Sequence, residues 1–222
     1  MNSDLIIRLI VTFVPLFLAI ILHEIAHGLA ARMLGDNTAK DKGRLSLNPL
    51  KHIDVFGTIL FPALLIYSGA GFVFGWAKPV PVNFAKLKNY RRDIVIVASA
   101  GIVTNFILAA AAALLLVPAK AISHPEILLV CNVFLVNMIV FNIALAVFNL
   151  LPIPPLDGSK MLFGWIERPW AQKYIAADRW GFIAIILLAV ILPEIGKFFE
   201  ANWNFFALYM IKASKFFISL FL

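Results

Sequence analysis

The sequence predicts an all-α polytopic membrane protein with about five to six transmembrane helices and one segment that re-enters the bilayer. Two observations predict this class. The chain has 222 residues, of which 62% are hydrophobic and only 14% are charged, whereas a soluble domain is close to half apolar and a quarter charged. Its apolar residues also form continuous runs long enough to cross a hydrocarbon core of about 30 Å.

Five apolar runs are expected to cross the bilayer fully, and the fourth is the shortest of them. They lie at about residues 5–33, 94–117, 127–150, 179–192 and 203–221. Prolines fall near several of the expected helix ends, where a missing backbone N–H costs least. The sequence contains no internal repeat, and all five runs are expected to belong to a single domain.

A sixth apolar stretch, residues 55–74, has basic residues on both flanks, which is typical of cytoplasmic loops. They are Lys40, Lys42, Arg44 and Lys51 before it, and Lys78, Lys86, Lys88, Arg91 and Arg92 after it. A segment with both ends on one side must turn back. We therefore expect a re-entrant hairpin at residues 54–83, with a helix over 54–68 and an extended return over 69–82. The alternative is an ordinary sixth crossing. Residues 43–48 alternate in character and predict a short strand or hairpin near the membrane surface.

The string His23-Glu24-Ile25-Ala26-His27 lies inside the first apolar run. On a helix, two histidines four residues apart share a face, so both imidazoles can bind one Zn²⁺ ion. Glu24 follows directly, where a carboxylate can act as general base toward a metal-bound water. Ionisable groups at bilayer depth are costly and indicate function. These residues predict a zinc hydrolase that works inside the membrane.

A catalytic zinc ion usually has three protein ligands, and Asp157 is the best candidate for the third. It ends a proline-rich string, residues 149–158, at which the third crossing must stop. The alternative is that Asp157 only caps the next helix. If residues 55–74 turn back, the third crossing ends on the cytoplasmic side, and Asp157 reaches the depth of His23. The charge pattern and the metal geometry therefore agree.

Composition also bounds the partners. The net charge of +7 is spread over short loops without stacking aromatic residues, which argues against nucleic-acid binding. The single cysteine, Cys131, allows no intrachain disulfide. The lipid bilayer is the expected environment, and the charge pattern predicts that the site lies toward its cytoplasmic side.

Together, His23-Glu24-Ile25-Ala26-His27 and the string Asn149-Leu150-Leu151-Pro152 to Leu156-Asp157-Gly158 resemble the site-2 protease family, the intramembrane zinc metalloproteases of the M50 class. Residues 75–83, Gly-Trp-Ala-Lys-Pro-Val-Pro-Val-Asn, are similar to a stretch of the compact bacterial members. The string at residues 100–105 is similar to the family's Ala-Gly-Pro-x-x-Asn, with isoleucine in place of the proline. The resemblance covers about residues 20–165.

The resemblance implies hydrolysis of peptide bonds within a transmembrane segment of a membrane-protein substrate. It implies one zinc ion held by His23, His27 and Asp157, with Glu24 as the base. Asn149 and Asn105 match family asparagines that position substrate or stabilise the oxyanion, and an interhelical hydrogen bond is the alternative for each. The whole chain, residues 1–222, would be one membrane-embedded metalloprotease domain. Its catalytic core would cover about residues 5–165, and the helices at about 179–221 would be accessory.

Two other functions are compatible with a zinc site in membrane helices. The first is a catalytically inactive zinc-binding regulator, which would not need Glu24. The second is a zinc transporter, in which polar residues are usually spread along a pathway and inverted repeats are common. Here the polar residues near the histidines form a single cluster. Natural substrate, gating partner and oligomeric state have no signature in the sequence.

Overall fold

The computed structural model describes residues 3–67 and 75–222, and within these ranges every regular element is helical. The long helices are α1 (Ser3–Met33), α4 (Tyr90–Ala119) and α5 (Pro125–Asn149). The shorter α-helices are α2 (Thr38–Asp41), α3 (Phe61–Tyr67), α6 (Asp157–Phe163), α7 (Pro169–Ile175), α8 (Asp178–Ile186), α9 (Leu192–Phe198) and α10 (Phe205–Ile218). The remaining helical turns are η1 (Pro49–His52), η2 (Val55–Leu60), η3 (Phe84–Lys86) and η4 (Leu187–Ile191).

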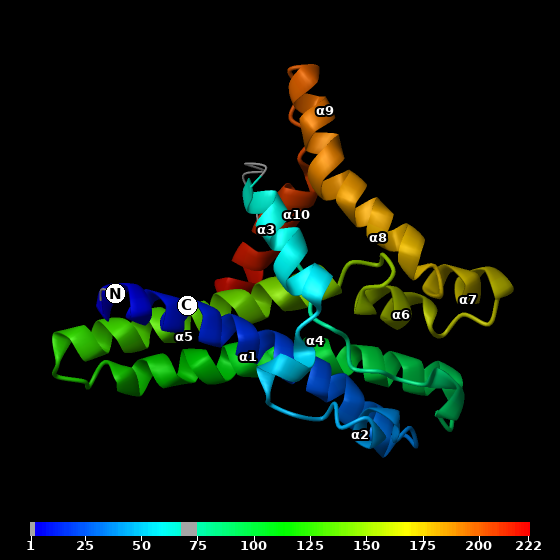
Figure 1. The fold of residues 1–222 in the computed structure, drawn as a ribbon, viewed down its shortest axis with the longest axis horizontal. Coiled ribbons are helices and arrows are strands. Elements are labelled where there is room, and N and C mark those ends of the chain that lie inside the picture. Colours follow the sequence, from blue (N-terminus) through cyan, green and yellow to red (C-terminus); the bar gives the residue numbers. More distant parts are fainter. Residues whose placement is uncertain (1–2, 68–74) are drawn as a thin grey trace.

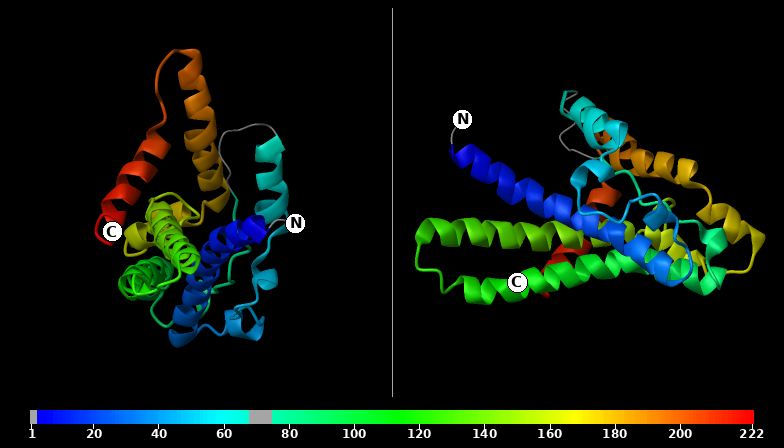
Figure 2. Two further views of the ribbon diagram at one scale, coloured as in Figure 1. Left: turned by 90° about the vertical axis from the view of Figure 1, so that its left-hand side faces the viewer. Right: turned by 60° about the horizontal axis from the view of Figure 1, so that its bottom comes forward.

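Helices α1, α4 and α5 pack against one another and form the centre of the molecule. Figure 1 shows them as long rods lying side by side, with α3 and the α8–α9 rod projecting from one side, and the views in Figure 2 agree. The core of α4 and α5 includes Ala109, Ile139, Ile143 and Val147, all fully buried. Small side chains on α4 face branched ones on α5, so the two helices approach closely.

Four helical stretches among the described residues are long and apolar enough to cross a membrane. They are Asp4–Met33, Tyr90–Ala119, Pro125–Asn149 and Asp178–Phe198, and they correspond to the first four predicted crossings. The fourth is continuous through α8, η4 and α9. The fifth predicted crossing is α10, which packs on α5. Its 14 residues extend about 21 Å, less than the thickness of the bilayer core.

The start of α4 shows how the sequence sets a helix end. Asn89 has an extended backbone, and its side chain accepts a hydrogen bond from the N–H of Arg92. In return, the Asp93 carboxylate accepts the N–H of Asn89 at 2.8 Å. The exchange satisfies two N–H groups at the helix terminus, as in a capping box. Helix α5 starts at Pro125, where proline's missing N–H has no helical partner to lose.

The segment after residue 54 turns back, as predicted. It consists of η2 and α3. The chain after it lies beside the start of the same segment, as the hydrogen bond of 3.0 Å from Trp76 N–H to Gly57 O shows. The Thr58 hydroxyl donates to Trp76 O at 2.8 Å. Gly57 and Trp76 therefore lie side by side, which excludes a full sixth crossing. The first part of the predicted extended return, residues 69–74, lies outside the described residues.

The strand or hairpin predicted at residues 43–48 was wrong, since this described stretch contains no strand. Gly43 has φ of +60°, a left-handed conformation that breaks an extended run. Arg44 N–H then turns back to Ala39 O at 2.9 Å. Asn48 accepts the N–H of Leu50 at 3.0 Å and caps η1. Local turns thus use the backbone groups that a strand would have needed for pairing.

Candidate metal centre

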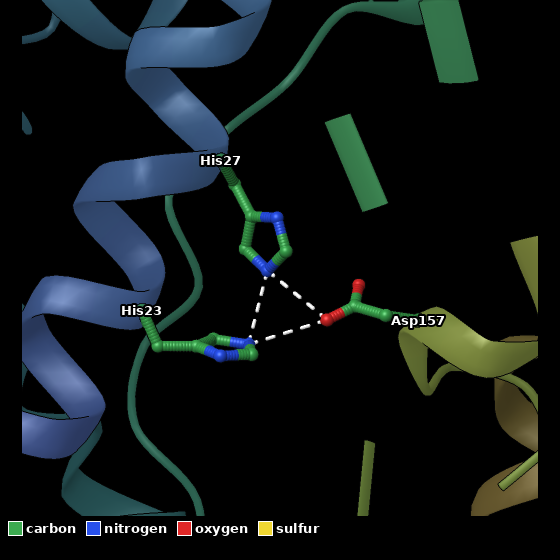
Figure 3. Close-up of side chains that lie close together, drawn as sticks. All are labelled: His23, His27 and Asp157. Carbon is green, nitrogen blue, oxygen red and sulfur yellow. Dashed lines mark hydrogen bonds and ion pairs between the residues drawn. The ribbon is translucent and has the colours of Figure 1, made fainter. Parts of the chain in front are cut away.

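Three side chains from two distant parts of the chain meet at one point. His23 and His27 lie one turn apart on α1, and their Nε2 atoms are 3.0 Å apart. Asp157, the first residue of α6, places Oδ2 at 3.2 Å from His23 Nε2 and 3.1 Å from His27 Nε2. All three residues are buried, with at most 9% of each exposed. Figure 3 shows the three atoms pointing toward one another.

The far nitrogen of each imidazole is held by a neighbouring helix. His27 Nδ1 lies 2.7 Å from the Val97 carbonyl of α4. A carbonyl only accepts, so His27 Nδ1 must carry the proton, and Nε2 then presents a lone pair. His23 Nδ1 lies 2.6 Å from Asn105 Oδ1, also on α4. Such outer partners fix the tautomer of metal-binding histidines and orient their rings.

The three atoms that meet at this point are suited to bind a cation. Two imidazole lone pairs and a carboxylate oxygen face one another at 3.0–3.2 Å, an arrangement of three acceptors that repel unless a positive charge lies among them. Asp157 Oδ2 is fully buried and accepts no hydrogen bond from the described part of the chain, which is costly unless the atom has another partner. Tetrahedral zinc bonded to nitrogen and oxygen at 2.0–2.1 Å separates its ligand atoms by about 3.3 Å. The group is the one His, Cys, Asp and Glu cluster of suitable geometry among the described residues.

Gly101 on α4 makes room for the two imidazoles. A Cβ at this position would lie 2.6 Å from Cε1 of His23 and 2.6 Å from both Cε1 and Nε2 of His27. No real Cβ atom approaches another heavy atom so closely. The absence of a side chain on Gly101 is therefore what allows α4 to pack directly against the histidine face of α1.

The loop that presents Asp157, residues 150–156, is held by contacts from the C-terminal part of the chain. The Tyr174 hydroxyl of α7 donates to Pro152 O at 2.6 Å, and Lys160 Nζ donates to Pro155 O at 2.6 Å. Gly181 of α8 packs on Pro154 so closely that any Cβ would overlap its carbonyl oxygen. Two carbonyls of this proline-rich loop thus accept hydrogen bonds and a third packs against Gly181, so the loop has little freedom to shift Asp157.

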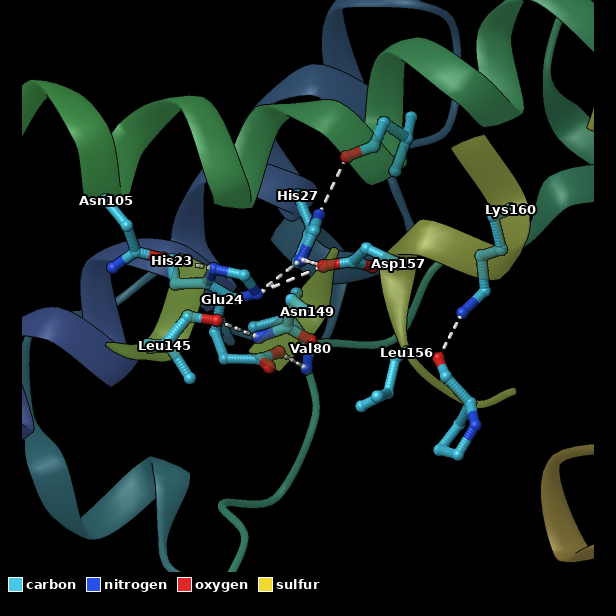
Figure 4. A network of polar contacts seen from close by, with 12 residues as sticks. His23, Glu24, His27, Val80, Asn105, Leu145, Asn149, Leu156, Asp157 and Lys160 are labelled. Carbon is cyan, nitrogen blue, oxygen red and sulfur yellow. Dashed lines mark hydrogen bonds and ion pairs between the residues drawn. The ribbon is translucent and has the colours of Figure 1, made fainter. Parts of the chain in front are cut away.

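Glu24 lies beside the three ligand candidates and is half-buried. Its Oε2 accepts a hydrogen bond of 2.7 Å from the backbone N–H of Val80. Figure 4 shows this contact together with His23, His27 and Asp157. Val80 belongs to the chain that returns from the re-entrant segment. One carboxylate oxygen of Glu24 is therefore held by a backbone N–H, which orients the side chain.

Residues 78–83, which we call the strap, are attached to the rest of the chain at several points. Lys78 N–H donates to His52 O at 2.8 Å, and Arg44 donates to Lys78 O at 2.8 Å. At the other end, Asn83 N–H donates to Asp36 Oδ2 at 2.6 Å. Burial alone would raise the pKa of Asp36, but hydrogen bonds from Thr38 and from the Asn83 backbone lower it below its ordinary value.

The two candidate asparagines have different surroundings. Asn105 is fully buried; its Oδ1 faces His23, and its Nδ2 donates to Ala19 O at 3.2 Å and to Asn142 Oδ1 at 2.8 Å. Both of its amide hydrogens are thus engaged. Asn149, at the end of α5, is 9% exposed, and its Nδ2 donates one hydrogen to Leu145 O at 3.0 Å. Figure 4 includes both residues.

Sequence reasoning missed three groups at this site: the Val80 N–H, the space at Gly101 and the amide of Asn142. A backbone N–H leaves no trace in side-chain chemistry, so the Val80 contact had no signal. Gly101 was noted for its motif but not for the space it leaves. Asn142 did have a signal, because an amide in the middle of an apolar membrane helix asks for a partner.

Comparison with known proteins agrees with this chemistry. The sequence profile of Peptidase family M50 matches residues 121–192. YwhC of Bacillus subtilis, which carries the name of a zinc metalloprotease, is 40% identical over 190 residues, covering 84% of this chain and 80% of its own. Rip2 of Mycolicibacterium smegmatis, named in the same way, is 32% identical over 199 residues, covering 85% of this chain and 70% of its own.

No solved structure is significantly similar to the chain. The matched residues 121–192 include Asp157. The chain therefore belongs to peptidase family M50, the family of zinc metalloproteases.

Proposed function

We propose that this protein is an intramembrane zinc endopeptidase that hydrolyses peptide bonds within transmembrane segments of membrane-protein substrates. One observation carries the proposal: two imidazole nitrogens on a helix of membrane-spanning character and the carboxylate oxygen of Asp157 converge within 3.2 Å. Three ionisable groups at such depth are costly unless they share a function. A carboxylate, Glu24, next to them supplies what a hydrolase needs beyond a binding site.

His23, His27 and Asp157 would hold one zinc ion. Zinc bound there supplies a Lewis acid that lowers the pKa of a bound water and polarises a carbonyl oxygen. Tertiary contacts within the protein position these side chains. His27 is oriented by the Val97 carbonyl, and Asp157 is oriented by the loop that Tyr174 and Lys160 hold. Such positioning lowers the cost of assembling the site.

Glu24 is assigned as the proton acceptor. Its Oε2 is engaged by the Val80 N–H at 2.7 Å, which leaves Oε1 to take a proton from the attacking water. The same carboxyl group then hands the proton to the leaving amine.

The asparagines are assigned to separate roles. Asn149 keeps one amide hydrogen beyond its bond to Leu145 O, and we propose that it donates this hydrogen to the substrate carbonyl, where negative charge develops. Asn105 has no amide hydrogen left to donate. We assign it to the orientation of His23 instead.

The strap limits how a substrate can dock. Two of its residues, Pro79 and Pro81, have no N–H. The N–H groups of Lys78, Val80 and Asn83 are already donated within the protein. Among the described strap residues, Val82 alone keeps a free N–H. The strap therefore lacks the N–H donors that regular β-strand pairing with a substrate segment would need. Strap carbonyls that accept from an unwound substrate segment fit this geometry better.

We place the site toward the cytoplasmic side of a bacterial inner membrane. The proposal rests on the basic residues that flank the re-entrant segment, since cytoplasmic loops carry an excess of lysine and arginine. The structure places the ends of this segment together. The partners in this proposal are the lipid bilayer and a substrate transmembrane segment, without nucleic acid.

The test compares wild-type protein with Glu24→Gln and Asp157→Ala in purified form and in membranes. Metal analysis is expected to give one zinc ion per chain for wild type and Glu24→Gln, and none for folded Asp157→Ala. Quantitative mapping of peptide termini in membranes is expected to find new termini inside transmembrane segments with wild type alone. Zinc binding without any such termini would leave a binding-only protein and refute the peptidase assignment. Zinc flux into proteoliposomes would instead support a transporter.

A further inference from the structure

A chain of side-chain amides links His23 to the backbone of α5. His23 Nδ1 lies 2.6 Å from Asn105 Oδ1. Asn105 Nδ2 donates to Asn142 Oδ1 at 2.8 Å, and Asn142 Nδ2 donates to Met138 O at 2.7 Å. Both asparagines are fully buried. The three hydrogen bonds run from the candidate ligand on α1 through α4 to α5, without a break and away from water.

The direction of this chain is set at its far end. Met138 O only accepts, so Asn142 must turn its Nδ2 toward Met138 and its Oδ1 toward Asn105. The Asn142 oxygen needs a donor, so Nδ2 of Asn105 must face it. The Ala19 carbonyl, 3.2 Å from the same Nδ2, needs a donor for the same reason. Oδ1 of Asn105 therefore faces His23, and Nδ1 of His23 must be the donor. The amide orientations of both asparagines thus follow from the hydrogen-bond network.

We propose that Asn142 is a positioning residue for the metal site. It holds Asn105 in the orientation that keeps the proton of His23 on Nδ1 and leaves the Nε2 lone pair facing Asp157. The inference rests on the proposed zinc site and deepens it. His27 needs no such relay, because the Val97 carbonyl fixes its tautomer directly.

Loss of the Asn142 amide has a defined consequence. Nδ2 of Asn105 would keep only the longer bond to Ala19 O, at 3.2 Å, and one of its two hydrogens would be left unpaired in an apolar core. The Asn105 amide orientation that places Oδ1 toward His23 would then be less strongly favoured in free energy over the flipped orientation. Changes to such outer partners typically cost 10- to 100-fold in metal affinity. Because Asn142 acts through Asn105, we expect about a tenfold loss of zinc affinity, at the low end of that range.

Helix α5 offers a matched control. Asn137 lies five residues earlier and donates its Nδ2 to Val11 O of α1 at 2.8 Å. It makes an amide-to-carbonyl bond to the same helix that carries the histidines, but about three turns away from them. Asn137→Ala therefore removes a comparable interhelical hydrogen bond without touching the relay.

The experiment uses the full-length purified protein with Zn²⁺ and Co²⁺ alone as probes. Zinc affinity is measured by chelator competition, and the absorption bands of bound Co²⁺ report ligand geometry. Asn142→Ala is expected to weaken zinc binding about tenfold and to shift the cobalt bands, whereas Asn137→Ala leaves both as in wild type. Equal zinc affinities and equal cobalt spectra for the two variants would overturn the proposal, since Asn142 would then be only structural.

A second variant covers the case in which Asn142→Ala does not fold. In Asn142→Thr the hydroxyl can bond back to Met138 O, four residues earlier, while no amide oxygen is offered to Asn105. It is expected to weaken zinc binding and shift the cobalt bands, and wild-type behaviour would overturn the proposal. If wild-type protein itself bound no zinc, the proposed function would fail first, which is a different result from wild-type-like binding by these variants.

Discussion

Gly101 gives the sharpest quantitative prediction. Gly101→Ala adds one methyl group where α4 faces the histidines. That carbon would lie 2.6 Å from atoms of both imidazoles, including Nε2 of His27. An ordinary contact is at least 3.4 Å, so the helices or the rings must separate by about 0.8 Å. Metal sites tolerate deviations of about 0.2 Å in ligand distance.

The magnitude follows from the cost of overpacking. An extra methyl group in a well-packed core typically costs about 1–3 kcal/mol. If the strain is relieved by moving His23 or His27, it appears as weaker metal binding, about 5- to 150-fold. If it is relieved by moving α4, it appears as lost stability of the metal-free protein. We expect the first route to dominate, because rotating an imidazole ring displaces fewer packed atoms than shifting a 30-residue helix.

The assay measures zinc affinity and thermal stability of the metal-free protein in the same detergent. Ala109→Val is the control, since Ala109 is fully buried on the same helix but packs against α5 in the core, two turns beyond Gly101. The control is expected to lower stability and leave zinc affinity unchanged. Zinc affinity of Gly101→Ala within twofold of wild type would refute the packing argument.

Three further predictions concern Glu24 and its surroundings. Glu24→Gln should keep zinc stoichiometry yet lower the cleavage rate by about 10²- to 10⁴-fold; retained turnover would remove the base assignment. Val80→Pro deletes the N–H that holds Glu24 while residues 79–81 stay extended, so the cleavage rate should fall. Val80→Ala keeps the N–H and should lower the cleavage rate less. A larger loss for Val80→Ala than for Val80→Pro would contradict the role of that hydrogen bond. The pKa of Asp36 is lowered in the folded protein. Its contribution to the free energy of unfolding is therefore complete above about pH 4, the pKa of an aspartate in the unfolded chain. The contribution is lost as the pH falls through the pKa of the folded state. The melting temperature of Asp36→Asn should therefore lie below that of wild type near neutral pH and converge with it in acid; parallel curves would contradict the linkage.

Much of this arrangement followed from the sequence for a physical reason. Histidines four residues apart share a helix face whatever surrounds them, and long apolar runs with basic flanks have few possible topologies. The return of Trp76 to Gly57 was predicted because charge bias constrains which side each end lies on. The meeting of Asp157 with His23 followed from the same topology.

Other features could not be predicted because they depend on three-dimensional contacts. The bond from Val80 N–H to Glu24 depends on where the strap crosses α1, and backbone donors carry no residue-specific pattern. The expected strand at residues 43–48 was lost to local turns at Gly43 and Asn48, which outcompete a strand that has no partner. The length of α10 was overestimated, because apolar composition continues past the point where the helix ends at Ile218.

The loop before Asp157 has a consequence for any shortened form of this protein. Every residue of the two motifs lies before position 160, yet the carbonyls of Pro152 and Pro154 are braced by Tyr174 and Gly181. A chain cut soon after the second motif would retain both sequence motifs. It would lose the contacts from Tyr174 and Gly181 that hold the loop and, through it, the carboxylate of Asp157 in position. Helices α7 and α8 therefore set the smallest working unit of this peptidase, and natural variation at Gly181 should be as restricted as at the motifs themselves.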